Sequence, residues 1–99
     1  MRDAARKALR FAQGRTRADL ESDELLALGL VKCIEIIGEA AAKVTSARRR
    51  NLPEIAWLDV VGMRHRSVHG YDQIDLDLVW GTVTDDLPGL VAILGRVLP

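Results

Sequence analysis

The segment from Leu25 to Val44 constrains the fold most, because it is apolar almost all the way round a helix. Its polar side is a narrow stripe of residues spaced three or four apart, namely Lys32, Glu35, Glu39 and Lys43. A helix with so little polar surface in a chain of 99 residues needs cover on two sides. Two interpretations stay open: the helix is central to a four-helix packing, or its second face meets another copy or a partner.

The rest of the chain is also patterned for helices. Apolar residues three and four apart predict helices from about Asp3 to Gln13, from an N-cap at Ser22 to about Ser46, from Ala56 to Ser67, and from Asp75 to Val97. Pro88 should kink or restart the last of these. No alternating run between turn residues suggests a strand. We therefore expect an all-α, antiparallel up-and-down bundle of four to five helices, in a single domain spanning residues 1–99.

Composition narrows the class of protein. Hydrophobic residues make up 48% of the chain and charged residues 28%, which is typical of a globular domain and not of a disordered one. The longest apolar stretches, Leu25–Val31 and Leu87–Gly95, are shorter than the roughly 20 residues of a membrane helix, so no membrane is expected. The charged N-terminus has no secretory pattern, and we expect the protein in the cytoplasm. The single cysteine, Cys33, excludes an internal disulfide and should be a small core residue.

Charge is divided unevenly along a chain whose formal net charge is zero. Residues 1–50 carry eleven Lys/Arg against seven Asp/Glu (+4), and residues 51–99 carry three against seven (−4). Both histidines, His65 and His69, nevertheless lie with Arg64 and Arg66 in one short stretch. That cluster is the clearest candidate for chemistry.

The residues of this stretch suit the cleavage of RNA. On a continuous helix Arg64 and His69 would point about 140° apart, but a helix end near Val68 and a turn at Gly70 let His69 and Tyr71 approach Arg64. RNA carries its own nucleophile, the 2′-hydroxyl, so cleavage needs an acid or base and a cation for the developing charge. His69 can supply the first and Arg64 the second. The alternative is surface charge at a helix end.

The pattern Arg64-x4-His69-x-Tyr71, with the polar His65 after the arginine, resembles the defining motif of the HEPN superfamily, in particular the HepT-like toxins. The resemblance covers the chain from about Leu20 to Leu94. Further matching segments are Ile37-Gly38-Glu39-Ala40, Pro53 through Trp57, Gly62-Met63-Arg64, and Ile74, Asp75, Val79 and Trp80. In one departure, His65 stands where the family most often has asparagine.

The resemblance implies an all-helical HEPN-like domain that forms a homodimer, with the motifs of both subunits facing one cleft. It implies a metal-independent endoribonuclease without a cofactor, acting on RNA and not on DNA. Carried onto this sequence, Arg64 and His69 would be catalytic. The implied partner is an MNT-type nucleotidyltransferase antitoxin, which silences the toxin by transferring AMP to Tyr71. The alternative within the same superfamily is a catalytically idle module that pairs with the nucleotidyltransferase or docks a nucleotide.

Several residues have two interpretations. Glu39 could pair with Lys43 as an exposed bridge, which we favour, or it could reach and orient Arg64. The run Arg48–Arg50 is either a solvated loop or an extension of an RNA-binding surface. Trp57 and Trp80 should belong to the core. For the dimer, we expect an interface on the second face of the long helix, including Leu26, Leu30 and Ile37.

Overall fold

The computed structural model describes the backbone of residues 1–69 and 73–97 and the side chains of residues 1–65 and 74–96. Within these ranges the chain is almost entirely helical, which confirms the all-α prediction. Its elements are α1 (Arg2–Ala12), α2 (Asp19–Ser22), α3 (Glu24–Ala42), α4 (Ser46–Asn51), α5 (Trp57–Ser67), β1 (Val68–His69), β2 (Gln73–Ile74), α6 (Leu76–Gly81), the π-helical turn η1 (Thr82–Asp86) and α7 (Leu87–Val97).

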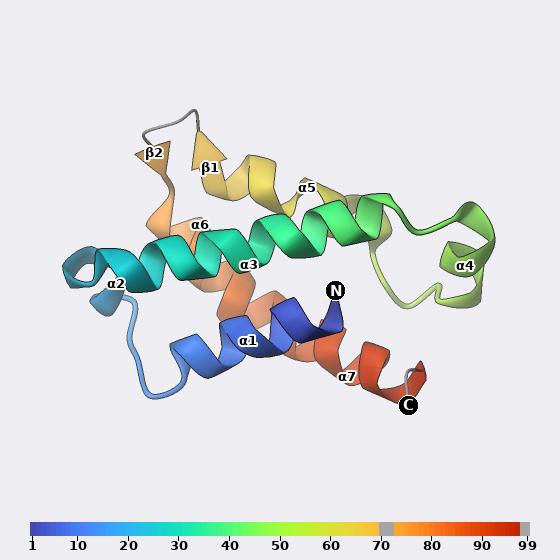
Figure 1. The fold of residues 1–99 in the computed structure, drawn as a ribbon, viewed down its shortest axis with the longest axis horizontal. Helices are drawn as coiled ribbons and strands as arrows, with labels where there is room; N and C mark the ends of the chain where they lie inside the picture. The colour runs from blue at the N-terminus through green and yellow to red at the C-terminus, as the bar shows by residue number, and fades with distance from the viewer. Residues whose placement is uncertain (70–72, 98–99) are drawn as a thin grey trace.

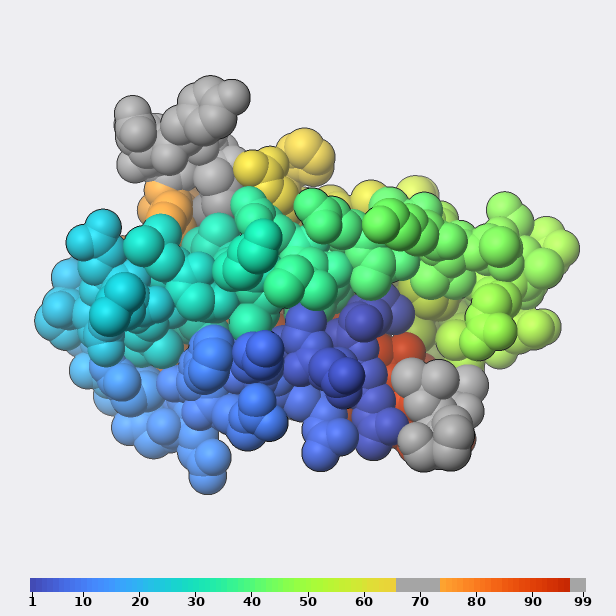
Figure 2. Space-filling view, in the orientation of Figure 1, coloured from blue at the N-terminus to red at the C-terminus, as the bar shows by residue number. Residues whose placement is uncertain are grey.

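The longest helix, α3, crosses the middle of the molecule, with α5 along one side and α1 along the other (Figure 1). The last helix, α7, packs on α1, while α6 reaches both α3 and α5. The space-filling view shows α3 and α1 lying side by side across one broad face (Figure 2). The molecule is flat, with extents of 42 × 29 × 16 Å. This arrangement leaves one side of α3 at the surface beside α5.

The ends of α3 differ from those predicted. Asp23, and not Ser22, is the N-cap, because its carboxylate accepts a hydrogen bond from the Leu26 N–H at 3.1 Å. At the other end α3 stops at Ala42 instead of near Ser46. Thr45 accounts for the early stop, since its hydroxyl caps the separate helix α4 by accepting from the Arg48 N–H at 3.2 Å. The run Arg48–Arg50 therefore lies in a short helix and not in a loop.

The buried face of α3 corrects the predicted dimer interface. Leu26, Leu30 and Ile37 are at most 8% exposed within the single chain, so they cannot form a second face. Within the chain, α3 packs against α1 on one side and α5 on the other. The large apolar side chains that α3 leaves exposed are instead Leu25, Leu28 and Ile36. The core that α3 organises includes these fully buried side chains: Leu30, Ile34, Ile37, Val79, Val83 and Leu87.

The last helical run is continuous from Leu76 to Val97, with η1 in its middle. Pro88 is the second residue of α7, one residue beyond the end of the π turn, and a widened turn before it relieves the clash between the proline ring and the preceding turn's carbonyl. Residues 76–96 are long and apolar enough to cross a membrane by length and composition, a test that buried core helices also pass. Val83 and Leu87 in this run are fully buried in the domain. One side of this run therefore packs into the core of the domain.

A short antiparallel strand pair follows α5, although no strand was predicted. Val68 pairs with Ile74, and His69 pairs with Gln73. The pair is only two residues long on each side, too short for an alternating pattern to appear in the sequence. Its position after Ser67 confirms the predicted helix end near Val68.

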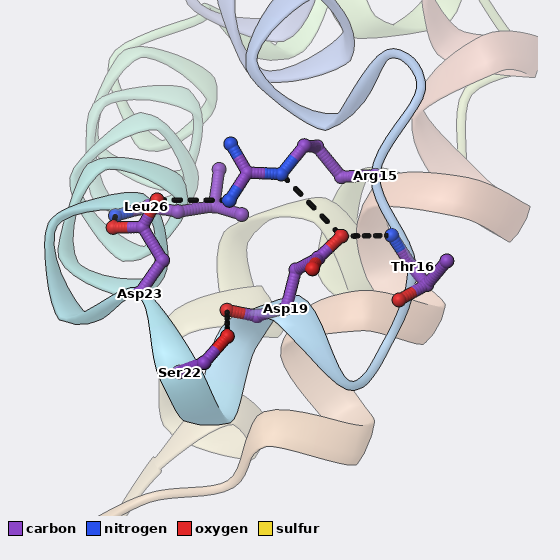
Figure 3. A network of polar contacts seen from close by, with 6 residues as sticks. All are labelled: Arg15, Thr16, Asp19, Ser22, Asp23 and Leu26. Atoms are coloured by element: carbon purple, nitrogen blue, oxygen red, sulfur yellow. Dashed lines mark hydrogen bonds and ion pairs between the residues drawn. The ribbon is translucent and has the colours of Figure 1, made fainter.

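The connection from α1 to α3 is fixed by a polar network (Figure 3). Arg15 donates to Asp23 at 2.8 Å and lies 3.4 Å from Asp19, while Asp19 accepts from the Thr16 N–H at 2.7 Å. The hydrogen bond from Arg15 is the main reason that the pKa of Asp23 is lowered, and the Thr16 N–H is the main reason that the pKa of Asp19 is lowered. Arg17 then ties this connection to Asp77 on α6 at 2.6 Å.

Candidate active site

Arg64 lies in the last two turns of α5 and makes an ion pair with α3. Its Nε donates to Oε1 of Glu35 at 2.8 Å. The Arg64 side chain is 49% exposed, whereas that of Glu35 is only 25% exposed. The other carboxylate oxygen of Glu35 lies 3.9 Å from Nζ of Lys32. Two cations from two helices therefore share one carboxylate at the surface of the domain.

The close crossing of α3 and α5 brings these residues together. Gly38 of α3 faces the backbone of α5, and a Cβ on it would lie 3.3 Å from the carbonyl oxygen of Val61. Glu35 lies one turn before Gly38 on α3, and Arg64 lies one turn after Val61 on the neighbouring α5. A larger residue at position 38 would require the two helices to separate by a few tenths of an ångström. The glycine of the Ile37-Gly38-Glu39-Ala40 segment thus explains how Glu35 reaches Arg64.

The remaining motif residues follow Arg64 along the chain. His65 is exposed on α5, next to Arg64 in sequence. The backbone of His69 lies in β1, directly after the helix end. The side chain of His69 and the whole of Tyr71 lie outside the described residues. The structure therefore places Arg64 in the last turn of α5 and ends the helix at Ser67, as the sequence predicted, whereas the strand pair that follows was not predicted.

Glu39 is exposed on α3, and among the described residues the structure gives it neither of its two expected contacts. The carboxylate that reaches Arg64 comes from Glu35, one turn earlier on the same helix. Glu35 belonged to the predicted polar stripe but was not singled out. The signal that could have found it is the antiparallel register about Gly38, which sequence periodicity alone does not supply.

The arginine run of α4 separates into two kinds of side chain. Arg49 turns inward, donates to the Ala41 carbonyl at 2.9 Å and lies over the Trp57 ring at 5.6 Å from its centre. Arg48 and Arg50 are exposed. Arg49 therefore has a structural role, and only its two neighbours stay candidates for a cationic surface.

The two tryptophans and the cysteine are placed much as predicted. Trp57 is buried and donates its indole N–H to the Leu52 carbonyl at 3.2 Å, and Trp80 is half-buried against the core. Cys33 is buried with a free thiol, and burial raises its pKa. All three residues are explained by packing.

A groove of about 560 Å³ lies between α5 and the run formed by η1 and α7. Its lining includes four carboxylates and neither Arg64 nor Glu35. Carboxylates repel the phosphates of RNA, so this groove is not a candidate for the RNA path. Its acidic lining residues are Glu54, Asp59, Asp85 and Asp86. Among the side chains that the structure describes, no three His, Cys, Asp or Glu residues come together as a metal site.

The fold and this site define a class of protein: an all-α domain in which Arg64 lies in the last turn of a helix and His69 follows in a short strand. The chain belongs to the HepT-like ribonuclease family, because the sequence profile described as "Ribonuclease HepT-like" matches residues 1–97. That match covers nearly the whole chain, so the resemblance seen in the motif extends to the domain.

Similar proteins carry ribonuclease names. One, "Probable ribonuclease HepT" of Thermococcus cleftensis, is 33% identical over 72 residues, which are 73% of this chain and 66% of that protein. A second, "Putative RNase MJ1380" of Methanocaldococcus jannaschii, is 27% identical over 86 residues, which are 87% of this chain and 79% of that protein. No solved structure matches this chain.

Proposed function

We propose that this protein is a metal-independent endoribonuclease toxin of a type II toxin–antitoxin pair, acting on RNA in the cytoplasm. The observation that carries the proposal is the position of Arg64, which Glu35 holds at 2.8 Å at the end of α5, directly before the hairpin that bears His69. Membership of the HepT-like ribonuclease family supports the same activity.

The proposed reaction uses the RNA's own 2′-hydroxyl as the nucleophile. His69 takes the proton from this hydroxyl or gives one to the leaving 5′-oxygen, since an imidazole exchanges protons near neutral pH. Arg64 stabilises the extra negative charge of the pentacoordinate phosphorus with its fork of N–H donors. The 2′-oxygen forms a new bond to phosphorus as the 5′-oxygen leaves, so the products carry a cyclic phosphate and a 5′-hydroxyl. Neither step calls for a cofactor.

The proposed toxin acts as a homodimer. One exposed face of α3 carries Leu25, Leu28, Lys32 and Ile36 at three-and-four spacing, and the three apolar residues among them stay between 39% and 83% exposed within the chain. Glu35 is seven residues from Leu28 and borders the same face. A second copy seated there would bring two Arg64 side chains toward one cleft. The substitution Leu28→Asp should then give a folded monomer by light scattering, and a wild type that is monomeric at micromolar concentration would contradict the proposal.

An MNT-type nucleotidyltransferase is the proposed antitoxin, with Tyr71 as the residue that accepts AMP. Adenylate is bulky and negatively charged, so beside His69 and Arg64 it would occupy the phosphate site and repel RNA. The mass of the protein after co-expression with the transferase tests this step, since each transfer adds one adenylate unit.

The activity itself is tested with purified protein and RNA in the presence of a chelator. We expect cleavage that persists, with cyclic phosphate at the product ends. Activity that a chelator abolishes and magnesium restores would contradict the mechanism. A protein that binds the transferase but cleaves no RNA would instead be an idle binding module.

A further inference from the structure

We infer that Glu35 is a positioning residue for the reaction, which fixes the guanidinium of Arg64 in the orientation that binds the scissile phosphate. The inference rests on the proposed ribonuclease activity and adds to it a residue on a different helix, 29 positions away in sequence. Glu35 touches neither RNA nor the reacting atoms in this scheme. It acts only through Arg64.

The first argument is the burial of the carboxylate. The side chain of Glu35 is 25% exposed, whereas the carboxylate partners in the other described ion pairs are between 36% and 83% exposed. An exposed ion pair is screened by water and holds its partners loosely. A carboxylate that is three-quarters covered is screened less and restricts its partner more. The Glu35–Arg64 pair is thus the described ion pair best suited to fix an arginine.

The second argument is the rigidity of what holds Glu35. The helix that carries Glu35 crosses α5 closely at Gly38, one turn away. A Cβ added to Gly38 would require the Val61 carbonyl of α5 to move. The second carboxylate oxygen of Glu35 lies 3.9 Å from Lys32 on the same helix. The carboxylate therefore has a defined position relative to α5, and the hydrogen bond transfers that position to Nε of Arg64.

The third argument is chemical. A guanidinium binds phosphate best through two parallel N–H bonds, so its plane must face the phosphate before the reaction begins. A free arginine side chain has many rotamers and loses that freedom on binding. The bond from Nε to Glu35 fixes the plane of the group in advance. A carboxylate beside a phosphate site also repels RNA, so its presence there weakens binding while improving orientation.

These opposed effects give a signature that a purely structural residue would not produce. Glu35→Ala should lower kcat by about 10- to 100-fold, because Arg64 is no longer oriented. KM for RNA should stay unchanged or fall, because one negative charge leaves the binding surface. Glu35→Gln keeps an oxygen that can accept from Nε, so it should lie between wild type and Glu35→Ala. Glu24→Ala, an exposed glutamate at the start of the same helix, is the matched control and should match wild type.

A double variant tests whether Glu35 acts through Arg64. In the background of Arg64→Ala, adding Glu35→Ala should cause less than a twofold further loss, because there is no guanidinium left to orient. A further loss of tenfold or more would mean that Glu35 takes part directly, and it would overturn the positioning role. Wild-type kcat in Glu35→Ala would overturn it as well.

One readout does not depend on cleavage. The Arg64 Nε–H signal in a ¹⁵N NMR spectrum should exchange slowly with water in wild type and in Glu24→Ala, and rapidly in Glu35→Ala. A rapidly exchanging signal in wild type would contradict this inference even where RNA is cleaved. A wild type with a slowly exchanging signal and no cleavage would contradict the proposed ribonuclease, and the pair would then be structural only.

Discussion

Gly38 of α3 and Val61 of α5 meet so closely that a side chain at position 38 would require α5 to move by a few tenths of an ångström: a Cβ on Gly38 would lie 3.3 Å from the Val61 carbonyl oxygen. The atom in the way belongs to the backbone of a packed helix, so it cannot turn aside as a side chain would. This contact sets the spacing at which Glu35 reaches Arg64. The stability of the domain and the geometry of its site therefore depend on the same glycine.

We expect Gly38→Ala to lower the free energy of unfolding by about 1 kcal/mol, because the cost of forcing the helices apart exceeds the helical preference of alanine. Urea denaturation measures this change. Gly29→Ala on the same helix is the control, since its Cβ would be an ordinary 3.5 Å from the Phe11 ring. That variant should gain about 0.5–1 kcal/mol. An equal gain in Gly38→Ala would show that α5 gives way easily.

Arg49→Ala should lower the free energy of unfolding by about 1–2 kcal/mol. The substitution removes the hydrogen bond to the Ala41 carbonyl and the contact with the Trp57 ring, both of which attach α4 to the core. Arg50→Ala is the matched control, because Arg50 is exposed on the same helix, and its effect should be within about 0.5 kcal/mol. Thermal unfolding of both variants decides the question. Equal stabilities would mean that the inward position of Arg49 contributes nothing.

Because of the polar network at the start of α3, we expect the free energy of unfolding to be lower in acid. The pKa of Asp23 is lowered, first by the hydrogen bond from Arg15 and then by the Leu26 N–H. A carboxylate whose pKa is lower in the folded state stabilises the fold above its unfolded pKa, and this stabilisation is lost as the pH falls through the folded value. The urea concentration at the midpoint of unfolding should therefore fall as the pH is lowered below about 4.

The substitution Asp23→Asn isolates that contribution, because it keeps a capping oxygen and removes the titrating group. The variant should be less stable than wild type at pH 7, and the difference should shrink toward pH 3. Glu24→Gln, a substitution at the neighbouring exposed residue, is the control. Its stability should depend on pH as that of wild type does. A difference between Asp23→Asn and wild type that does not change with pH would contradict the assignment.

The sequence predicted the fold well because its signals are periodic and local. The long helix, the helix ending near Val68, and the buried face of the last helix all follow from apolar spacing. What it missed depends on single capping side chains and on register. Thr45 begins α4 with one hydroxyl, which periodicity does not distinguish from a continuing helix. Which leucines of α3 face inward was also misjudged, since a helix that is apolar nearly all round carries little directional information.

The candidate site, like the fold, was predicted from the sequence only in part. The motif residues were found by their resemblance to a family, and the helix end that follows Arg64 was predicted from the glycine at position 70. Its partner was not found, because Glu35 and Glu39 lie on the same polar stripe and only the α3–α5 crossing selects between them. Gly38 makes this selection, because it lets α3 approach α5 closely. The sequence does not show which helices are neighbours, so this role is recognised only in the structure.

The catalytic assignments predict large losses of activity without loss of fold. Arg64→Ala should lower the cleavage rate by about 100-fold or more, because charge stabilisation matters most in the transition state. His69→Ala should be comparably damaging, since proton transfer is typically worth about 10²–10⁴-fold. Single-turnover cleavage of RNA, with circular dichroism to confirm folding, measures both. His65→Ala should cause a smaller loss. Toxicity that persists in Arg64→Ala or His69→Ala would contradict their roles.

Tyr71→Phe should separate cleavage from silencing. It keeps the aromatic ring and removes only the hydroxyl that would accept AMP, so substantial nuclease activity should remain while the transferase can no longer modify the protein. Cells that carry this variant should therefore stop growing even when the antitoxin is present. Wild type with the antitoxin is the control that grows, and Arg64→Ala, which needs no silencing, should grow with or without it. If the Tyr71→Phe strain grows only when the transferase is active, AMP is attached to a residue other than Tyr71.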